Sequence, residues 1–203
     1  AVILTLALDQ VITALGIDRG SGKMLIATSS SLNISNTLPA MHKLYWYDGF
    51  SNKVSKSVIV DDMITALYPL GNTVFVGYGQ NLGYLNGSGI EFLKRLKNVT
   101  LAQESLPWKH HFTHIGSTLY IIDGDQILAF GPVLQGGSKV FYYLYLNDVT
   151  ADAAFRSLFN AGNNKLGFSC TTEKFHTLDV TGIANTSNGI EIHTCWYNFA
   201  RPV

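Results

Sequence analysis

Short apolar runs separated by turn residues cover the whole chain. Many of the runs are rich in β-branched and aromatic residues, and Gly, Asn, Asp and Ser stand between them. No long stretch has the 3.6-residue period of an amphipathic helix. The pattern therefore predicts an all-β protein with almost no helix.

The apolar runs repeat along the chain. The run Val-Ile-Thr-Ala-Leu at 11–15 returns as Met-Ile-Thr-Ala-Leu at 63–67, and fainter echoes begin near 112 and 155. The steps are 52, 48 and 43 residues. A period near 45 with four short runs in each unit is typical of β-propeller blades. The residues expected at equivalent positions of the four first strands are Ile12, Ile64, Phe112 and Phe155.

Each repeat divides into four antiparallel strands joined by turn residues. The blades are expected at 11–62, 63–110, 111–153 and 154–199 of one propeller domain that covers 1–203. The expected strands are Val11–Gly16, Met24–Ser29, Lys43–Tyr47, Val54–Val60, Ile64–Tyr68, Thr73–Tyr78, Gly83–Leu85, Ile90–Leu96, Phe112–Ile115, Thr118–Ile122, Gln126–Phe130, Val140–Leu146, Phe155–Phe159, Lys165–Ser169, Phe175–Asp179 and Ile190–Tyr197.

An additional apolar run precedes the first repeat. By analogy with Val54–Val60, residues Val2–Ala7 are expected to be the outer strand of a further blade, within 1–10. The chain then belongs to a larger ring or a longer polypeptide, and this strand pairs with residues outside the 203 shown or with another subunit. The alternative is that it closes a compact ring against the fourth blade.

Composition narrows the class of partner. The 203 residues are 47% hydrophobic and 14% charged, with 14 basic and 14 acidic residues. Nucleic-acid binders usually carry a basic excess, so that class is disfavoured. No apolar run is long enough to span a membrane as a helix. Zero net charge suits a protein inside an assembly, because it provides little repulsion between subunits.

The two cysteines are expected to be free thiols. Cys170 ends the second strand of the fourth repeat, and Cys195 lies on its fourth strand. Two strand spacings separate them, roughly 9–10 Å. A disulfide needs Cα atoms within about 7 Å.

The segment Lys43–Phe50, followed by Ile64–Leu67 and Thr73–Gly77, resembles the blades of propellers in tail and virion-associated proteins of bacteriophages. The closing segment 190–202 resembles the aromatic-rich strand that ends such propellers. This resemblance implies a structural component of a virus particle. It carries no catalytic residue over to this sequence.

Metal and enzyme chemistry find little support. Three histidines near the third repeat (His110, His111 and His114), with Asp123 as a fourth ligand, are not expected to converge on a metal. The segment Asp123–Asp125 offers two carboxylates and is expected to be a hairpin turn rather than a calcium loop. Sialidase boxes, paired carboxylates and nucleophile motifs do not stand out. We therefore predict no enzyme activity, no cofactor and no metal.

Aromatic residues and long connections are the remaining candidates for binding. Most strand aromatics are expected to pack between blades, whereas Trp108 lies outside the strands. The two longest connections, Ser29–His42 and Asn98–Lys109, are expected on one face. Asn33 lies in the first of them, in one of four N-x-S/T sequons attributed to chance. The candidate binding residues are Trp108, Trp46, Tyr47, His42, His110 and Asn33.

Together these observations predict a non-enzymatic structural and binding propeller of a phage tail or tail adaptor. Its expected location is the virion, and its expected partners are other virion subunits, further domains of the same polypeptide and a surface glycan. The alternative is a carbohydrate-binding or carbohydrate-active propeller, extracellular or on a tail fibre. An intracellular scaffold of the WD or kelch kind is disfavoured, because the W-D dipeptide and the paired glycines of those repeats are missing.

Overall fold

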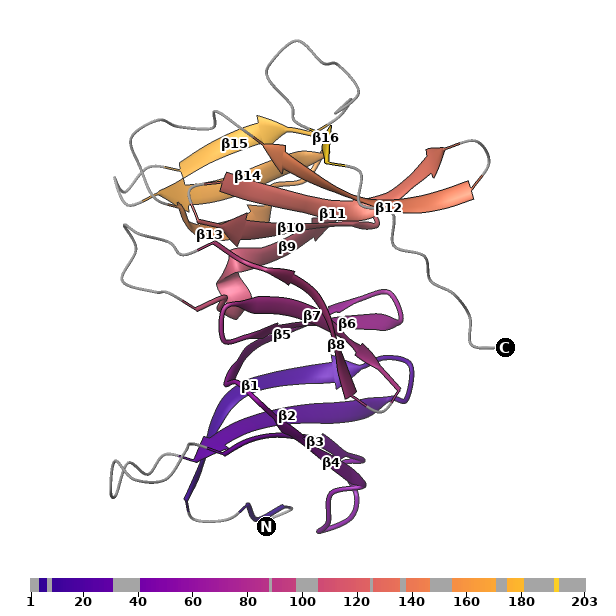
Figure 1. The fold of residues 1–203 in the computed structure, drawn as a ribbon, viewed down its shortest axis with the longest axis vertical. Helices are drawn as coiled ribbons and strands as arrows, with labels where there is room; N and C mark the ends of the chain where they lie inside the picture. The colour runs from indigo at the N-terminus through magenta and orange to yellow at the C-terminus, as the bar shows by residue number, and fades with distance from the viewer. Residues whose placement is uncertain are drawn as a thin grey trace. The chain divides into compact units, whose positions relative to one another are not determined.

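The computed structural model describes residues 4–6, 9–30, 41–87, 89–97, 106–124, 126–135, 138–146, 155–170, 175–180 and 192–193. These residues form four antiparallel sheets and one short 3-10 turn, so the all-β prediction is confirmed (Figure 1). The chain divides into two compact units. The first contains Ala1–Leu96 and Glu104–Lys109, and the second contains Lys97–Gln103 and His110–Val203.

The first unit holds two four-stranded sheets whose strands follow chain order. Sheet 1 is β1 (Gln10–Asp18), β2 (Lys23–Ser30), β3 (His42–Tyr47) and β4 (Lys56–Val60). Sheet 2 is β5 (Ile64–Leu70), β6 (Thr73–Tyr78), β7 (Asn81–Asn86) and β8 (Gly89–Arg95).

The second unit begins with the 3-10 turn η1 (Lys109–His111). Sheet 3 is β9 (Phe112–Ile115), β10 (Thr118–Asp123), β11 (Gln126–Gln135) and β12 (Ser138–Leu146), with β16 (Ile192–His193) on the β12 edge. Sheet 4 is β13 (Phe155–Asn160), β14 (Lys165–Cys170) and β15 (Phe175–Asp179).

The repeat is visible in the strand register. Three first strands carry a register shift at the same place, between Ile12 and Ala14 in β1, between Ile64 and Ala66 in β5, and between Phe155 and Ser157 in β13. Three of the four residues expected to be equivalent (Ile12, Ile64 and Phe155) therefore are equivalent.

The prediction for Phe112 is wrong by three residues. Phe112 pairs with Ile121 at the fourth position of β10, which is the place that Leu67 takes opposite Val76 in sheet 2. Strand β9 has only four residues and no register shift, and a 3-10 turn occupies the place of the missing positions. Leu15 and Leu158 take the same place in their sheets, so the steps between equivalent positions become 52, 45 and 46 residues.

Each sheet has two distinct faces. We call the face that carries Ile64 and Leu67 in sheet 2, and Phe155 and Leu158 in sheet 4, the leading face, and the opposite one the trailing face. In the first unit the leading face of sheet 2 packs on the trailing face of sheet 1. That core consists of Leu25, Ala27, Leu44, Trp46, Val60, Ile64, Leu67, Val74 and Val76.

The second unit repeats this packing. The leading face of sheet 4 covers the trailing face of sheet 3, and the residues come from the same strand positions. Each large apolar side chain buried in this way contributes roughly 1.5–3 kcal/mol to folding. That core consists of Tyr120, Ile122, Ile127, Ala129, Phe155, Leu158, Leu166, Phe168 and Cys170.

Two strands differ from the sequence prediction in length. Strands β11 and β12 extend to Gln135 and from Ser138 as a two-stranded ribbon, visible beyond the rest of their sheet in Figure 1. The predicted strand ended at Phe130, before Gly131 and Pro132. Strand β10 pairs with β11 only as far as Phe130. Beyond that point β11 has no neighbour on the β10 side, so Pro132, which has no backbone N–H, removes no hydrogen bond to β10.

The closing strand is also in a different place. Ile190–Tyr197 was expected as the fourth strand of the last blade, but its described part, β16, pairs with β12 of sheet 3. The rest of that segment, including Cys195, lies outside the described residues. Cys170 is a buried free thiol at the end of β14.

The predicted strand Val2–Ala7 is described only at residues 4–6, which form no strand. A strand exists only where ladder hydrogen bonds join it to a neighbour. These three residues have no such neighbour within the described part of the chain. The partner predicted for this strand stays a prediction.

Candidate functional site

Three connections meet at one edge of the sheets in the first unit. Strand β2 ends opposite the start of β3, β4 leads directly into β5, and β6 turns into β7 at the same edge. The segment 106–109 joins them, because the Thr65 hydroxyl donates to the carbonyl of Pro107 at 3.1 Å. We call this edge the loop edge. It carries the described ends of both long connections, Ser29–His42 and Asn98–Lys109.

Two carboxylates and a phenol dominate the loop edge. Asp61 and Asp62 are exposed, and Tyr78 is half-buried beside them. Burial, together with the charges of Asp62 and Asp61, raises the pKa of Tyr78 above its ordinary value. The hydroxyl therefore stays protonated at neutral pH, so it can donate a hydrogen bond but is a poor nucleophile.

Trp108 is held at this edge by tight packing. Its backbone N–H donates to the carbonyl of Leu106 at 3.0 Å, and the side chain is half-buried. A Cβ on Gly77 would lie 2.8 Å from the carbonyl oxygen and 2.9 Å from Cγ of Pro107. Only glycine lets β6 approach the segment 106–109 this closely.

Replacing Gly77 with Ala should therefore displace the segment 106–109. We expect faster amide exchange at Trp108 and a lower melting temperature, because the Thr65–Pro107 hydrogen bond is lost as well. Gly89→Ala is the matched control, since nothing lies within 4 Å of its Cβ position. Hydrogen exchange by mass spectrometry measures both variants. Unchanged exchange at 106–109 in Gly77→Ala would contradict the packing argument.

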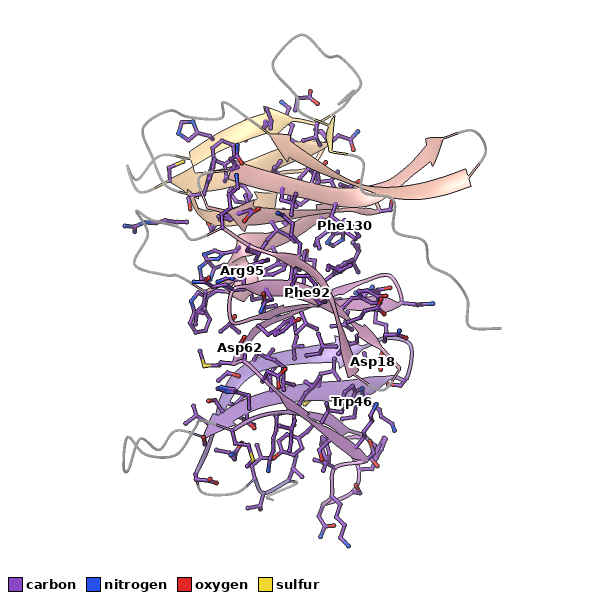
Figure 2. All side chains as sticks on the ribbon, viewed as in Figure 1. Asp18, Trp46, Asp62, Phe92, Arg95 and Phe130 are labelled. Atoms are coloured by element: carbon purple, nitrogen blue, oxygen red, sulfur yellow. The ribbon has the colours of Figure 1, made fainter. Side chains whose placement is uncertain are left out.

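The other predicted binding residues do not form one site with Trp108. His42 lies at the loop edge, half-buried, and its Nδ1 atom has no hydrogen-bond partner within the described residues. Trp46 and Tyr47 lie at the opposite end of β3 and are both buried. Figure 2 shows Asp62 near one end of the strands of the first unit, and Asp18 and Trp46 near the other end. Asn33 lies outside the described residues.

Trp46 is engaged by its neighbours. Its indole N–H donates to Asp18, and Lys56 Nζ lies 4.4 Å from its ring centroid. Partial burial alone would raise the pKa of Asp18, but hydrogen bonds from Ser21, Gly20 and Trp46 hold it below its ordinary value. Little of the Trp46 ring is left for a ligand.

The three histidines do not assemble a metal site. His110 is exposed and its ring meets the ring of His111 edge to face at 4.4 Å, whereas His111 is buried. His111 lies in the 3-10 turn that precedes β9. Asp123 is fully buried and accepts a hydrogen bond from the backbone N–H of Lys97. No group of three or more His, Cys, Asp and Glu side chains is placed to hold a metal ion within the described ranges.

The hairpin β7–β8 in sheet 2 contains a coupled pair of titratable groups. Burial and a hydrogen bond to Glu91 raise the pKa of Tyr84 to about 12, and the hydrogen bonds from Tyr84 and Asn86 lower the pKa of Glu91. A pKa raised above its ordinary 10 contributes stability below pH 10, and this contribution is lost as the pH rises towards 12.

Removing the phenol should flatten this alkaline response. We expect Tyr84→Phe to lose less stability than the wild type between pH 10 and about 12, in urea denaturation at each pH. Glu91→Gln is the companion variant, which should lower the pKa of Tyr84. Identical alkaline stability curves for Tyr84→Phe and wild type would refute the coupling.

A second surface was missed by the sequence analysis. The leading face of sheet 1 is apolar and open: Ile12, Leu15, Ile17 and Met24 are each about half exposed. Pairing places them on one face, because Leu15 lies opposite Ile26 and Ile17 opposite Met24. The signal was present in the repeated Val-Ile-Thr-Ala-Leu run, but repetition alone does not tell which copy is covered.

No protein family, curated protein or solved structure shows significant similarity to this chain. Among the described residues, no helix is long and apolar enough to cross a membrane.

Proposed function

We propose that this protein is a non-enzymatic β-propeller module of a virus particle, such as a phage tail or tail adaptor, and that it works through assembly contacts. The sheets are its blades, and their repeated register and face-to-face packing within each unit support this architecture. The observation that carries the proposal is the open apolar face of sheet 1. Monomeric soluble proteins rarely leave such a face uncovered, whereas subunits of assemblies bury it.

The tests are association with particles and catalysis. Particles from the organism that encodes the chain are separated on a density gradient, and the chain is quantified by mass spectrometry. We expect it to migrate with intact particles at a fixed ratio to the other subunits and to show no turnover of glycoside substrates. Recovery only in the soluble fraction, or hydrolysis of a glycan, would overturn the proposal.

Glycan binding at the loop edge is the second candidate function. Trp108 lies outside the strands and is half-buried, and the exposed carboxylates Asp61 and Asp62 lie at the same edge. A partly exposed indole beside hydrogen-bonding groups suits stacking on a sugar ring.

Trp108→Ala tests this candidate. We expect binding on a glycan array to fall at least tenfold, about 1.4 kcal/mol, while the melting temperature changes little. Asp62→Asn should weaken binding less, because it keeps a hydrogen-bonding group. A large loss of stability with binding intact would show that Trp108 serves packing only.

A further inference from the structure

The open face of sheet 1 contrasts with its equivalents inside the protein. Leu15 is 50% exposed, whereas Leu67 and Leu158 at the same position of the repeat are 0% and 5% exposed. Met24 is 44% exposed, and its equivalents Val74 and Leu166 are 1% and 0% exposed. The positions of Leu15 and Met24 are therefore core in two sheets and surface in the third, whereas Ile26 between them is buried, as Val76 and Phe168 are at the equivalent position.

A polar group on this face also lacks a partner. Tyr47 lies opposite Met24, so it belongs to the leading face. Its hydroxyl is buried and has no hydrogen-bond partner within the described residues. Because this hydroxyl is already buried within the chain, an occupant of the face could reach it only if neighbouring side chains moved.

In each unit, what covers a leading face is the sheet that comes immediately before it in the chain. That sheet presents mainly aliphatic residues and one aromatic residue on its two middle strands. They are Leu25, Ala27, Leu44 and Trp46 in sheet 1, and Tyr120, Ile122, Ile127 and Ala129 in sheet 3. In the first unit the fourth strand of that sheet leads directly into the covered sheet, because only Asp61–Met63 separate β4 from β5. Counting back from Ile12 as from Ile64, residues 4–6 correspond in sequence to the first part of β4, although they form no strand themselves.

We propose that a further four-stranded sheet of this repeat, contributed by polypeptide that precedes sheet 1, packs its trailing face on the leading face of sheet 1. This inference rests on the proposed propeller architecture and names the occupant of its open face. The partner chemistry is a sheet with apolar, mainly aliphatic residues on its two middle strands.

The trailing face of sheet 4 is chemically a poorer occupant. Its first two strands present Ser157, Gly167 and Ser169 together with the ring of Phe159, which lies over Gly167, and the hydroxyls of Ser157 and Ser169 lie 2.7 Å apart. Thr177 follows on β15, opposite Gly167. This face is more polar than the trailing faces of sheets 1 and 3, which form the cores. Coverage of the leading face of sheet 1 by sheet 4, from this chain or from a second copy, is therefore an alternative outcome of the test.

The first experiment uses the 203-residue chain. Leu15→Glu is compared with Leu67→Glu, the same substitution at the equivalent covered position. We expect Leu15→Glu to remain monomeric with a melting temperature within about 3 °C of wild type, as for exposed sites, and Leu67→Glu to unfold the first unit. Peroxide should oxidise Met24 and Met41 at similar rates, since both are 44% exposed. Protection of Met24 in the monomer, or on raising the concentration, would identify sheet 4 or a second copy as the occupant and overturn the proposal.

The second experiment uses the polypeptide as it is encoded upstream of Ala1. We expect oxidation of Met24 to slow by about tenfold or more relative to Met41, because reaction then needs local opening of the interface. Leu15→Glu in this longer protein should restore the oxidation of Met24. Equal oxidation of the two residues, or an upstream segment with no such sheet, would refute the occupant. Particle association is measured separately, so its failure would count against the proposed function and leave these protection results standing.

Discussion

Phe168→Ala should lower the free energy of unfolding of the second unit by about 3–5 kcal/mol, the range for removing a fully buried aromatic side chain. Phe168 is 1% exposed and lies at the centre of the core between sheets 3 and 4. The ring of Phe155 meets it edge to face at 5.3 Å and 81°, and the ring of His176 stacks on it at 5.3 Å and 13°. The variant removes both contacts and leaves a cavity.

Phe159→Ala is the matched control on the same sheet. Phe159 is 39% exposed and lies on the trailing side, over Gly167. We expect less than half the loss seen for Phe168→Ala, because fewer of its contacts are buried. Hydrogen exchange of peptides from sheets 3 and 4 under increasing urea measures the second unit separately from the first. Equal losses in the two variants would show that this core is loosely packed.

The strand pattern was predictable because local chemistry determines it. Turns such as Gly71-Asn72 and Asn163-Asn164 use residues that tolerate a left-handed backbone, and Gly71, Asn163 and Asn164 have φ of 60°, 49° and 55°. Strand boundaries next to such turns agree with the sequence to within a few residues. The repeat of the apolar runs, four to a unit, indicated which strands belong together, and the first three sheets follow the expected order β1–β4, β5–β8 and β9–β12.

Non-local features were not predictable. The pairing of β16 with β12 joins segments about 50 residues apart, and nothing in Ile192–His193 specifies that neighbour. The shifted position of Phe112 follows from the register of β9 against β10, which an apolar run does not reveal. Burial is similarly non-local: Leu15 and Leu67 lie in nearly identical local sequences but have opposite exposure.

In the candidate site, too, features set by local sequence were predictable and features set by packing were not. Trp108 was identified correctly as lying outside the strands, since Pro107 precedes it in a polar connection. Trp46 was a candidate for binding because it is aromatic, yet its burial depends on sheet 2, whose leading face it contacts. Only the packing between sheets shows that Trp46 is a core residue and that Trp108 is not.

Trp46→Ala should therefore destabilise the first unit strongly, by about 3–5 kcal/mol, rather than remove a binding group. The indole is 5% exposed, belongs to the core with Leu44 and Ile64, and donates to the carboxylate of Asp18. Its loss creates a cavity between sheets 1 and 2. It also removes one of the hydrogen bonds that lower the pKa of Asp18, so that pKa should rise.

Trp46→Phe separates packing from hydrogen bonding. It keeps most of the ring volume and loses the N–H, so we expect a loss of about 1–2 kcal/mol from the hydrogen bond to a charged group and the smaller ring. Urea denaturation followed by exchange in sheet 1 and sheet 2 peptides measures both variants, and NMR titration of Asp18 follows its pKa. Trp108→Ala serves as the comparison, since it should change binding more than stability. If Trp46→Ala instead weakened ligand binding while leaving exchange in both sheets unchanged, Trp46 would be a binding residue, and the core between sheets 1 and 2 would depend on its aliphatic members alone.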